Sequence, residues 1–148
     1  MSSRYQLSHQ ILSETFAHCR HCGRGARECQ VLWLSPWSAP DTITKIVHPR
    51  HAASYGGIDV DSRWLHQFWQ TLAQQKYGVR IQVHTHPNEA FHSATDDAFP
   101  IVHTAGFLSL VIPDFAQGPI GFDGAFLAEL REDGCWQEVS ISERLLLV

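Results

Sequence analysis

Apolar side chains recur every three or four positions in two stretches of the chain, which is the spacing of an amphipathic helix. The first stretch covers residues 8–22 and ends at Gly23 and Gly25, and the second begins at a capping residue, Asp61 or Ser62. The two apolar stripes are Ile11, Leu12, Phe16 and Cys19, and then Trp64, Leu65, Phe68, Trp69 and Leu72. The sequence therefore predicts two main helices.

Shorter runs, either continuously apolar or alternating between apolar and polar residues, predict β-strands around these helices. Asp133-Gly134 is a strong hairpin signal, because both residues readily adopt the positive φ of a tight turn. Residues 54–59, which contain a glycine pair, predict a loop. The expected strands cover residues 29–34, 42–47, 79–83, 107–112, 121–130 and 135–140.

Two helices and about five to seven strands in this order are typical of an α+β fold. We expect a mixed β-sheet wrapped by the two main helices. The 148 residues suit one domain that covers residues 1–148, because no repeat, linker or change of composition marks a boundary.

Composition argues against two classes of partner. The net charge is −4 and the basic residues do not cluster, so a nucleic-acid partner is not expected. No apolar run approaches the roughly 20 residues that span a bilayer, and the N-terminus lacks the layout of a signal peptide. We therefore expect a cytoplasmic protein whose four cysteines are thiols.

Residues 84–96 carry the candidate chemistry. Side chains two positions apart on a strand point to the same face, so His84 and His86 can reach one ion. Pro87 takes the chain out of regular strand pairing, and the loop that follows can return Asp96 to the same ion. Two imidazoles and a carboxylate, without a thiolate, suit a catalytic zinc ion that keeps its fourth position for water.

This segment resembles the signature of the JAMM metalloprotease family (also called MPN+ or JAB), which reads His-x-His-Pro, a short loop and then Ser-x-x-Asp. The usual loop between the proline and the serine is one residue longer than residues 88–92 here. With a one-residue deletion in that loop, Ser93 and Asp96 occupy the serine and aspartate positions. A count without the deletion places Asp97 at the ligand position, so Asp97 is the alternative ligand.

The resemblance also implies a glutamate on an early strand, and Glu28 stands directly before the first predicted strand. It implies that Glu28 accepts a proton from metal-activated water and passes it to the leaving amine, and that Ser93 donates a hydrogen bond to the oxyanion. His84, His86 and Asp96 are then the zinc ligands. The implied fold is the arrangement that JAMM proteins share with cytidine deaminases.

The resemblance to the compact prokaryotic branch of the family also implies a substrate. It is an isopeptide or peptide bond at the C-terminus of a ubiquitin-like protein, cut during deconjugation or precursor processing. Partners resembling ubiquitin-activating (E1-like) and ubiquitin-conjugating (E2-like) enzymes are implied as well. Two alternatives remain: a metal-free scaffold domain, and a zinc amidohydrolase that acts on a small molecule.

The remaining cysteines and histidines show no second metal motif. Cys19 and Cys22 can share one helical face, but a structural zinc site needs four ligands and no second pair stands at a matching spacing. Cys29 lies beside the proposed glutamate, and we expect all three cysteines to be structural thiols. His92 and His103 flank the metal loop and can contact substrate or support a ligand. No partner pattern surrounds His48, His51 and His66.

Overall fold

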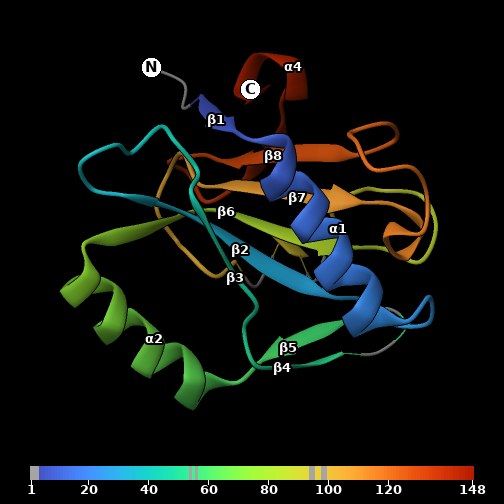
Figure 1. Ribbon diagram of the computed structural model, residues 1–148, viewed down its shortest axis with the longest axis horizontal. Coiled ribbons are helices and arrows are strands. Elements are labelled where there is room, and N and C mark those ends of the chain that lie inside the picture. Colours follow the sequence, from blue (N-terminus) through green and yellow to red (C-terminus); the bar gives the residue numbers. More distant parts are fainter. Residues whose placement is uncertain (1–3, 54, 56, 94–95, 98–99) are drawn as a thin grey trace.

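A computed structural model describes residues 4–53, 55, 57–93, 96–97 and 100–148. Its centre is a six-stranded sheet (Figure 1). In spatial order the strands are β3 (Lys45–Val47), β2 (Gln30–Pro36), β6 (Tyr77–Thr85), β7 (Leu108–Ile112), β8 (Phe126–Leu130) and β9 (Trp136–Glu138).

The sheet is mixed. Strands β6 and β7 run parallel, with Ile81 opposite Leu108, and the other neighbouring pairs are antiparallel. The parallel pair places the C-terminal ends of β6 and β7 at the same edge of the sheet. The antiparallel partner β2 begins at that edge, because Gln30 lies opposite His84. The segments before β2 and after β6 and β7 therefore converge there.

Two capped helices accompany the sheet. Helix α1 (His9–Gly23) begins at Ser8, whose hydroxyl accepts the N–H of Ile11, and ends at Arg24 in the left-handed conformation. Helix α2 (Ser62–Gln75) begins at Asp61, whose carboxylate accepts the N–H of Trp64 at 2.8 Å. Both N-caps are the residue types that satisfy the free N–H groups of a first helical turn.

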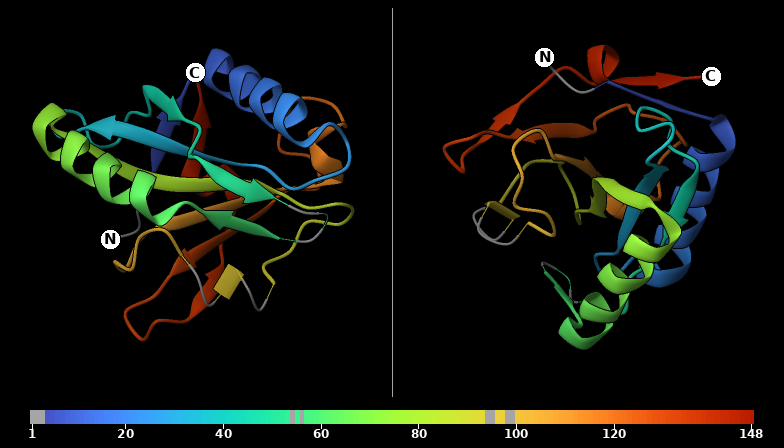
Figure 2. Two further views of the ribbon diagram at one scale, coloured as in Figure 1. Left: turned by 90° about the horizontal axis from the view of Figure 1, so that it is seen from below. Right: turned by 90° about the vertical axis from the view of Figure 1, so that its left-hand side faces the viewer.

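The helices cover opposite faces of the sheet (Figure 2). Alternate residues of β2 show this division: Val31 and Trp33 pack in the cluster of α1, whereas Leu32 and Leu34 pack in the cluster of α2. The continuously apolar sequence of β2 follows from this burial on both faces. The indole N–H of Trp33 is satisfied by the Thr15 hydroxyl of α1 at 2.8 Å.

Smaller elements complete the fold. Near the two ends of the chain, β1 (Tyr5–Leu7) pairs in parallel with β10 (Leu145–Leu147), which follows the short helix α4 (Ile141–Arg144). A separate hairpin joins β4 (His51–Ala53) to β5 (Ile58–Val60), and a 3₁₀ turn, η1 (Asp114–Ala116), follows β7. Within the described part of the chain, no helix has the length and apolar character needed to cross a membrane.

The structure confirms the α+β fold, the mixed sheet and the two main helices. Several strand boundaries were wrong. The strand expected over residues 42–47 starts only at Lys45. Residues 58 and 59, expected in a loop, begin β5. The strand expected over residues 121–130 starts only at Phe126, because an irregular segment of turns and bends occupies the residues before it.

Thr15→Val tests the buried contact between α1 and the sheet. The threonine hydroxyl donates to the Ile11 carbonyl and accepts the Trp33 indole N–H, and both bonds are buried. Valine keeps the shape but leaves the indole N–H unpaired, so we expect the free energy of unfolding in a denaturant titration to fall by about 1–3 kcal/mol. Thr71→Val is the matched control, because Thr71 makes the same bond to a helical carbonyl on an exposed face; it should change stability by less than about 0.5 kcal/mol. Equal losses in the two variants would contradict the assignment.

Candidate metal centre

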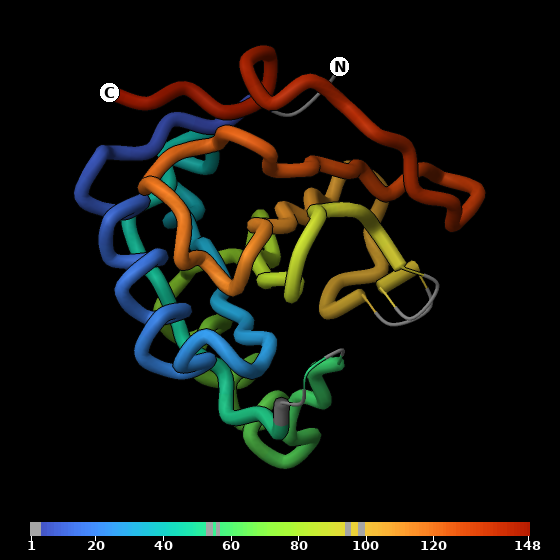
Figure 3. The backbone as a smooth tube through the Cα atoms, turned by 90° about the vertical axis from the view of Figure 1, so that its right-hand side faces the viewer, coloured from blue at the N-terminus to red at the C-terminus, as the bar shows by residue number. Residues whose placement is uncertain are grey.

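The two histidines of the motif stand where β6 leaves the sheet. His84 is the last residue but one of β6 and His86 is the first residue beyond the strand, and both side chains are buried. Figure 3 faces the side of the molecule on which β6 ends and on which the loop after it runs. Thr85, between them, points its hydroxyl to the backbone of Cys29. The alternation expected of a strand thus directs both imidazoles away from Thr85.

Hydrogen bonds fix the backbone of His86 although it lies beyond the strand. Its N–H donates to the carbonyl of Ile112 at 2.9 Å, and its carbonyl accepts the N–H of Phe115 at 2.8 Å. Phe115 belongs to η1, where φ is positive at all three residues, and this left-handed turn directs the N–H toward His86. Asp114 donates its N–H to the carbonyl of Asn88 at 2.9 Å and holds the loop in the same way.

A second pair of bonds places Glu28 beside the histidines. The N–H of Cys29 donates to the Thr85 hydroxyl at 2.9 Å, and the Thr85 N–H donates to the Cys29 carbonyl at 3.0 Å. Glu28 therefore lies next to the end of β6, and its side chain is buried. One carboxylate oxygen of Glu28 and one ring nitrogen from each of His84 and His86 lie within 4.8 Å of one another.

Asp96 completes the group from the loop. Its Oδ2 atom lies 3.2 Å from the Nε2 atom of His84 and 3.2 Å from the Nε2 atom of His86. Reciprocal bonds with Ser93 hold it: Oδ2 accepts the Ser93 N–H at 2.9 Å, and the Ser93 hydroxyl oxygen accepts the Asp96 N–H at 3.1 Å. Because Ser93 accepts in that bond, its O–H remains available to donate.

The charges in the group influence one another. Burial alone would raise the pKa of Asp96, but His84 and His86 outweigh it and hold this pKa well below its usual range. Burial raises the pKa of Glu28, although the two histidines oppose the shift. Burial would lower the pKa of His86, but Asp96 outweighs it and raises this pKa. The lowered pKa of Asp96 favours the ionised carboxylate, which is the form in which a carboxyl group binds a metal.

The donor set fits a small divalent cation. The metal–nitrogen and metal–oxygen bonds of zinc are about 2.0–2.2 Å, so neighbouring ligand atoms of a tetrahedral site lie roughly 3.3–3.5 Å apart. Both nitrogen–oxygen distances to Asp96 are close to this at 3.2 Å. Nε2 of His84 is buried and makes no hydrogen bond to any described part of the chain. A cation among these three side chains would satisfy that nitrogen.

Asp97, the alternative ligand, faces another residue. Its Oδ1 atom lies 2.5 Å from Nδ1 of His92, and Nε2 of His92 lies 3.1 Å from the hydroxyl of Ser109. Both ring nitrogens of His92 are therefore engaged outside the metal group, and its ring packs against Trp136 at 4.5 Å between centroids. His92 therefore contacts the loop that carries Asp96, a position that fits the supporting role, one of the two that the sequence left open for it. His103 is exposed.

The structure also reveals a cluster that the sequence did not. Cys22, Cys29, His48 and His51 converge, although Cys22 was expected to be a structural thiol and the two histidines were expected to have no partners. The spacing hid this cluster, because the two cysteines are separated by 6 residues and the two histidines by only 2. His48 comes close to Cys29 because of the register between β2 and β3.

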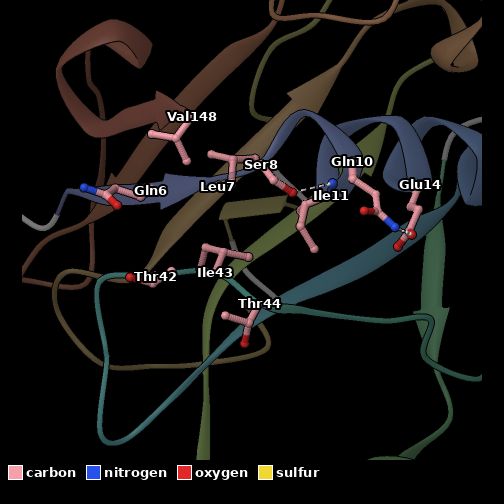
Figure 4. A pocket seen from close by; sticks show the side chains of 10 residues that line it. All are labelled: Gln6, Leu7, Ser8, Gln10, Ile11, Glu14, Thr42, Ile43, Thr44 and Val148. Carbon is pink, nitrogen blue, oxygen red and sulfur yellow. Dashed lines mark hydrogen bonds between the residues drawn. The ribbon is translucent and has the colours of Figure 1, made fainter.

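A well-formed pocket lies elsewhere in the molecule. It has a volume of about 450 Å³ and is enclosed by β1, the start of α1 and residues 42–44 (Figure 4). Gln6, Ile11 and Glu14 are among the residues that line it, and none of the metal-centre residues does. The reactive groups are thus at the sheet edge and not in this pocket.

Comparison with known proteins finds a relative by sequence and several proteins of similar fold by structure. No family model matches the chain. A protein of Sinorhizobium fredii named probable metalloprotease y4jG is 34% identical over 140 residues, which cover 90% of this chain and 85% of that protein. AF2198 of Archaeoglobus fulgidus, a JAB1/MPN domain protein, superposes with a TM-score of 0.54 at 14% identity, covering 99% of this chain and all of that one. DSY2949 of Desulfitobacterium hafniense superposes with a TM-score of 0.68 at 17% identity, covering 97% and 92%.

Asp96→Asn and Asp97→Asn test which aspartate completes the centre. Asp96 faces both histidine nitrogens, so its amide variant should bind one zinc equivalent per chain at least about tenfold more weakly than the wild type. Asp97 pairs with His92 and its variant should bind zinc like the wild type. Isothermal titration of metal-stripped protein measures both. The opposite order of the two variants would move the ligand to Asp97.

Proposed function

This chain belongs to the JAMM/MPN metalloprotease family, and on that premise we propose that it is a zinc peptidase that cuts an amide bond at the C-terminus of a ubiquitin-like protein. The observation that carries the proposal is the position of Asp96 Oδ2, 3.2 Å from both Nε2 atoms, with the Glu28 carboxylate beside them. His84, His86 and Asp96 would hold the metal, and Glu28 remains free for proton transfer.

When bound, zinc supplies Lewis-acid chemistry: it lowers the pKa of a coordinated water to about 7 and polarises the scissile carbonyl. The residues of the chain supply the rest. The Glu28 carboxylate accepts the proton of the attacking water and returns it to the leaving nitrogen. The Ser93 O–H, left free by the bond that its oxygen accepts from Asp96, donates to the oxygen of the carbonyl as negative charge develops on it.

Two exposed aromatic rings beside the centre favour a peptide substrate over a small molecule. Phe91 is 52% exposed and stands edge-on to His86, with 4.6 Å between ring centroids. Tyr55 is 61% exposed and packs against Phe115, the residue that binds the His86 carbonyl. Exposed aromatic side chains at a binding surface contact apolar side chains of a partner.

The β4–β5 hairpin adds a reason to favour an extended tail. Among the described residues, β4 pairs only with β5, so each of these two strands has a free edge. An extended peptide can add to such an edge through main-chain hydrogen bonds. Ubiquitin-like proteins end in a tail of this kind, and E1-like and E2-like enzymes are the partners that would attach it to a target.

Glu28→Gln tests the proton-transfer role. We expect kcat/KM to fall about 10²–10⁴-fold because glutamine cannot accept the proton, while the number of zinc ions per chain stays unchanged. The assay follows release of a fluorogenic amine from the C-terminal glycine of a ubiquitin-like protein. Glu132→Gln, an exposed carboxylate away from the centre, should cleave like the wild type. Full activity of Glu28→Gln would remove this role. Wild-type protein that binds no zinc at micromolar concentration would favour the metal-free scaffold, and zinc-loaded wild type that cleaves only small amides would favour the amidohydrolase.

Phe91→Ala tests the substrate class. Loss of the ring removes about 1 kcal/mol of aromatic contact, so KM for the ubiquitin-like substrate should rise several-fold. Zinc binding should stay unchanged. A short acyl-amide without a protein part should be cleaved equally by the variant and the wild type. If the variant changes neither reaction, the ring does not contact the substrate.

A further inference from the structure

The cluster of Cys22, Cys29, His48 and His51 lies outside the proposed catalytic centre. One sulfur or nitrogen atom of each of these residues lies within 4.8 Å of those of the other three. Cys22 Sγ is 3.4 Å from Nε2 of His51, and Cys29 Sγ is 3.3 Å from Nε2 of His48. Two sulfur and two nitrogen ligand atoms thus face a common point.

Four separate segments bring these side chains together. Cys22 is in the last turn of α1. The left-handed residues Arg24 and Gly25 then reverse the chain, so that Cys29 lies close to Cys22. His48 follows β3, which lies antiparallel to β2, so it comes near the start of β2 where Cys29 stands. His51 opens β4. Such convergence is a property of the fold and not of one flexible loop.

The distances suit tetrahedral zinc. Zinc–sulfur bonds of about 2.3 Å and zinc–nitrogen bonds of about 2.0–2.1 Å place neighbouring sulfur and nitrogen ligands roughly 3.6 Å apart. The two sulfur–nitrogen distances, 3.4 and 3.3 Å, are near this value, and all four atoms lie within 4.8 Å of one another. Two sulfur and two nitrogen ligands in a tetrahedron are typical of zinc.

Neighbouring groups already orient the imidazoles as ligands. Nδ1 of His51 lies 2.8 Å from the Pro49 carbonyl, and only a protonated nitrogen can donate to that oxygen. The lone pair of His51 is therefore on Nε2, the atom that faces Cys22. A histidine ligand of a metal commonly has its other nitrogen held in this way. The ring of His18 stacks on His48 at 5.8 Å between centroids and supports it from outside the cluster.

We propose that Cys22, Cys29, His48 and His51 bind a structural zinc ion, distinct from the ion at His84 and His86. Both thiols release their protons to solvent as they bind, so the site becomes neutral with two thiolates and one Zn²⁺. Four protein ligands leave no position for water, which makes the site structural and not catalytic. His48 is exposed and gives the ion a route of entry.

The ion would join parts of the fold that strand pairing leaves separate. Within the described residues, the β4–β5 hairpin forms its own two-stranded sheet and pairs with no strand of the main sheet. The zinc site ties the start of this hairpin, through His51, to the end of α1 and the start of β2. Cys29 is the neighbour of Glu28, so the ion would also hold the backbone that carries the proposed proton acceptor. The hairpin lies beneath the C-terminal end of α1 in Figure 1.

Cobalt substitution separates the two metal sites. The His84 centre contains no sulfur ligand, so a near-ultraviolet thiolate-to-cobalt charge-transfer band can come only from cysteine ligands. Metal-stripped, reduced protein titrated with Co²⁺ should bind two equivalents, one of which produces this band. Asp96→Asn should weaken the other equivalent and keep the band at full intensity, and this result does not depend on whether the protein is a peptidase.

Variants of the cluster identify its ligands. Cys22→Ser should lose the band and one equivalent of cobalt, and His48→Ala, a change at an exposed residue that the fold tolerates, should bind that equivalent at least about tenfold more weakly. Cys135→Ser is the matched control, because Cys135 is exposed and outside the cluster. In the Asp96→Asn background, added zinc should raise Tm, and the further change Cys22→Ser should abolish this rise.

Three results would overturn the proposal. The first is wild-type protein that saturates with cobalt without a charge-transfer band. The second is a band of unchanged intensity and affinity in both Cys22→Ser and His48→Ala. The third is a Cys22–Cys29 disulfide, found by mass spectrometry in protein prepared under reducing conditions, because these two thiols would then form a redox pair.

Discussion

Oδ2 of Asp96 lies 3.2 Å from two imidazole nitrogens that are themselves buried, and the rest of the candidate centre is arranged around this contact. An isolated carboxylate loses hydration when it leaves water, so it needs positive charge or hydrogen-bond donors around it. The Ser93 N–H supplies one donor, and the histidines supply the rest only if they carry a proton or share a cation. A divalent metal satisfies all three side chains together, which explains why a small protein would bury them at one edge of its sheet.

The fold holds the parts of this centre with different degrees of rigidity. His84 comes from a strand that pairs on both sides, and His86 is held by main-chain bonds to Ile112 and Phe115. Glu28 is held by the two hydrogen bonds between its neighbour Cys29 and Thr85. Asp96 comes from a loop that Ser93 and His92 hold by hydrogen bonds. The proposed zinc at Cys22 and Cys29 would strengthen the Glu28 side of this arrangement, because it anchors the chain one residue from the carboxylate. One metal ion would then take part in catalysis, and the other would stabilise the neighbouring part of the fold.

Much of this could be predicted from the sequence, and the failures have a physical cause. The helical stripes, the doubly buried β2 and the shared face of His84 and His86 are local patterns, and the structure has them all. The sequence favoured Asp96 over Asp97 through an assumed one-residue deletion, and the pairing of Asp97 with His92 could not be predicted, since it forms across a loop. The start of β5 was predicted to lie in a loop, because β4 and β5 are only three residues long and give no alternating pattern. The neighbouring cysteine–histidine cluster was missed because it forms through the β2–β3 register and the left-handed turn at Arg24, and neither leaves a recognisable spacing.

Anomalous diffraction at the zinc absorption edge, from crystals grown with zinc, would show whether His84, His86 and Asp96 hold an ion. We expect a strong peak within bonding distance of Nε2 of His84, Nε2 of His86 and a carboxylate oxygen of Asp96, with Glu28 near the ion but outside its ligand set. A map without a peak among these three side chains, in crystals whose protein has this fold, would show that they do not form a metal centre.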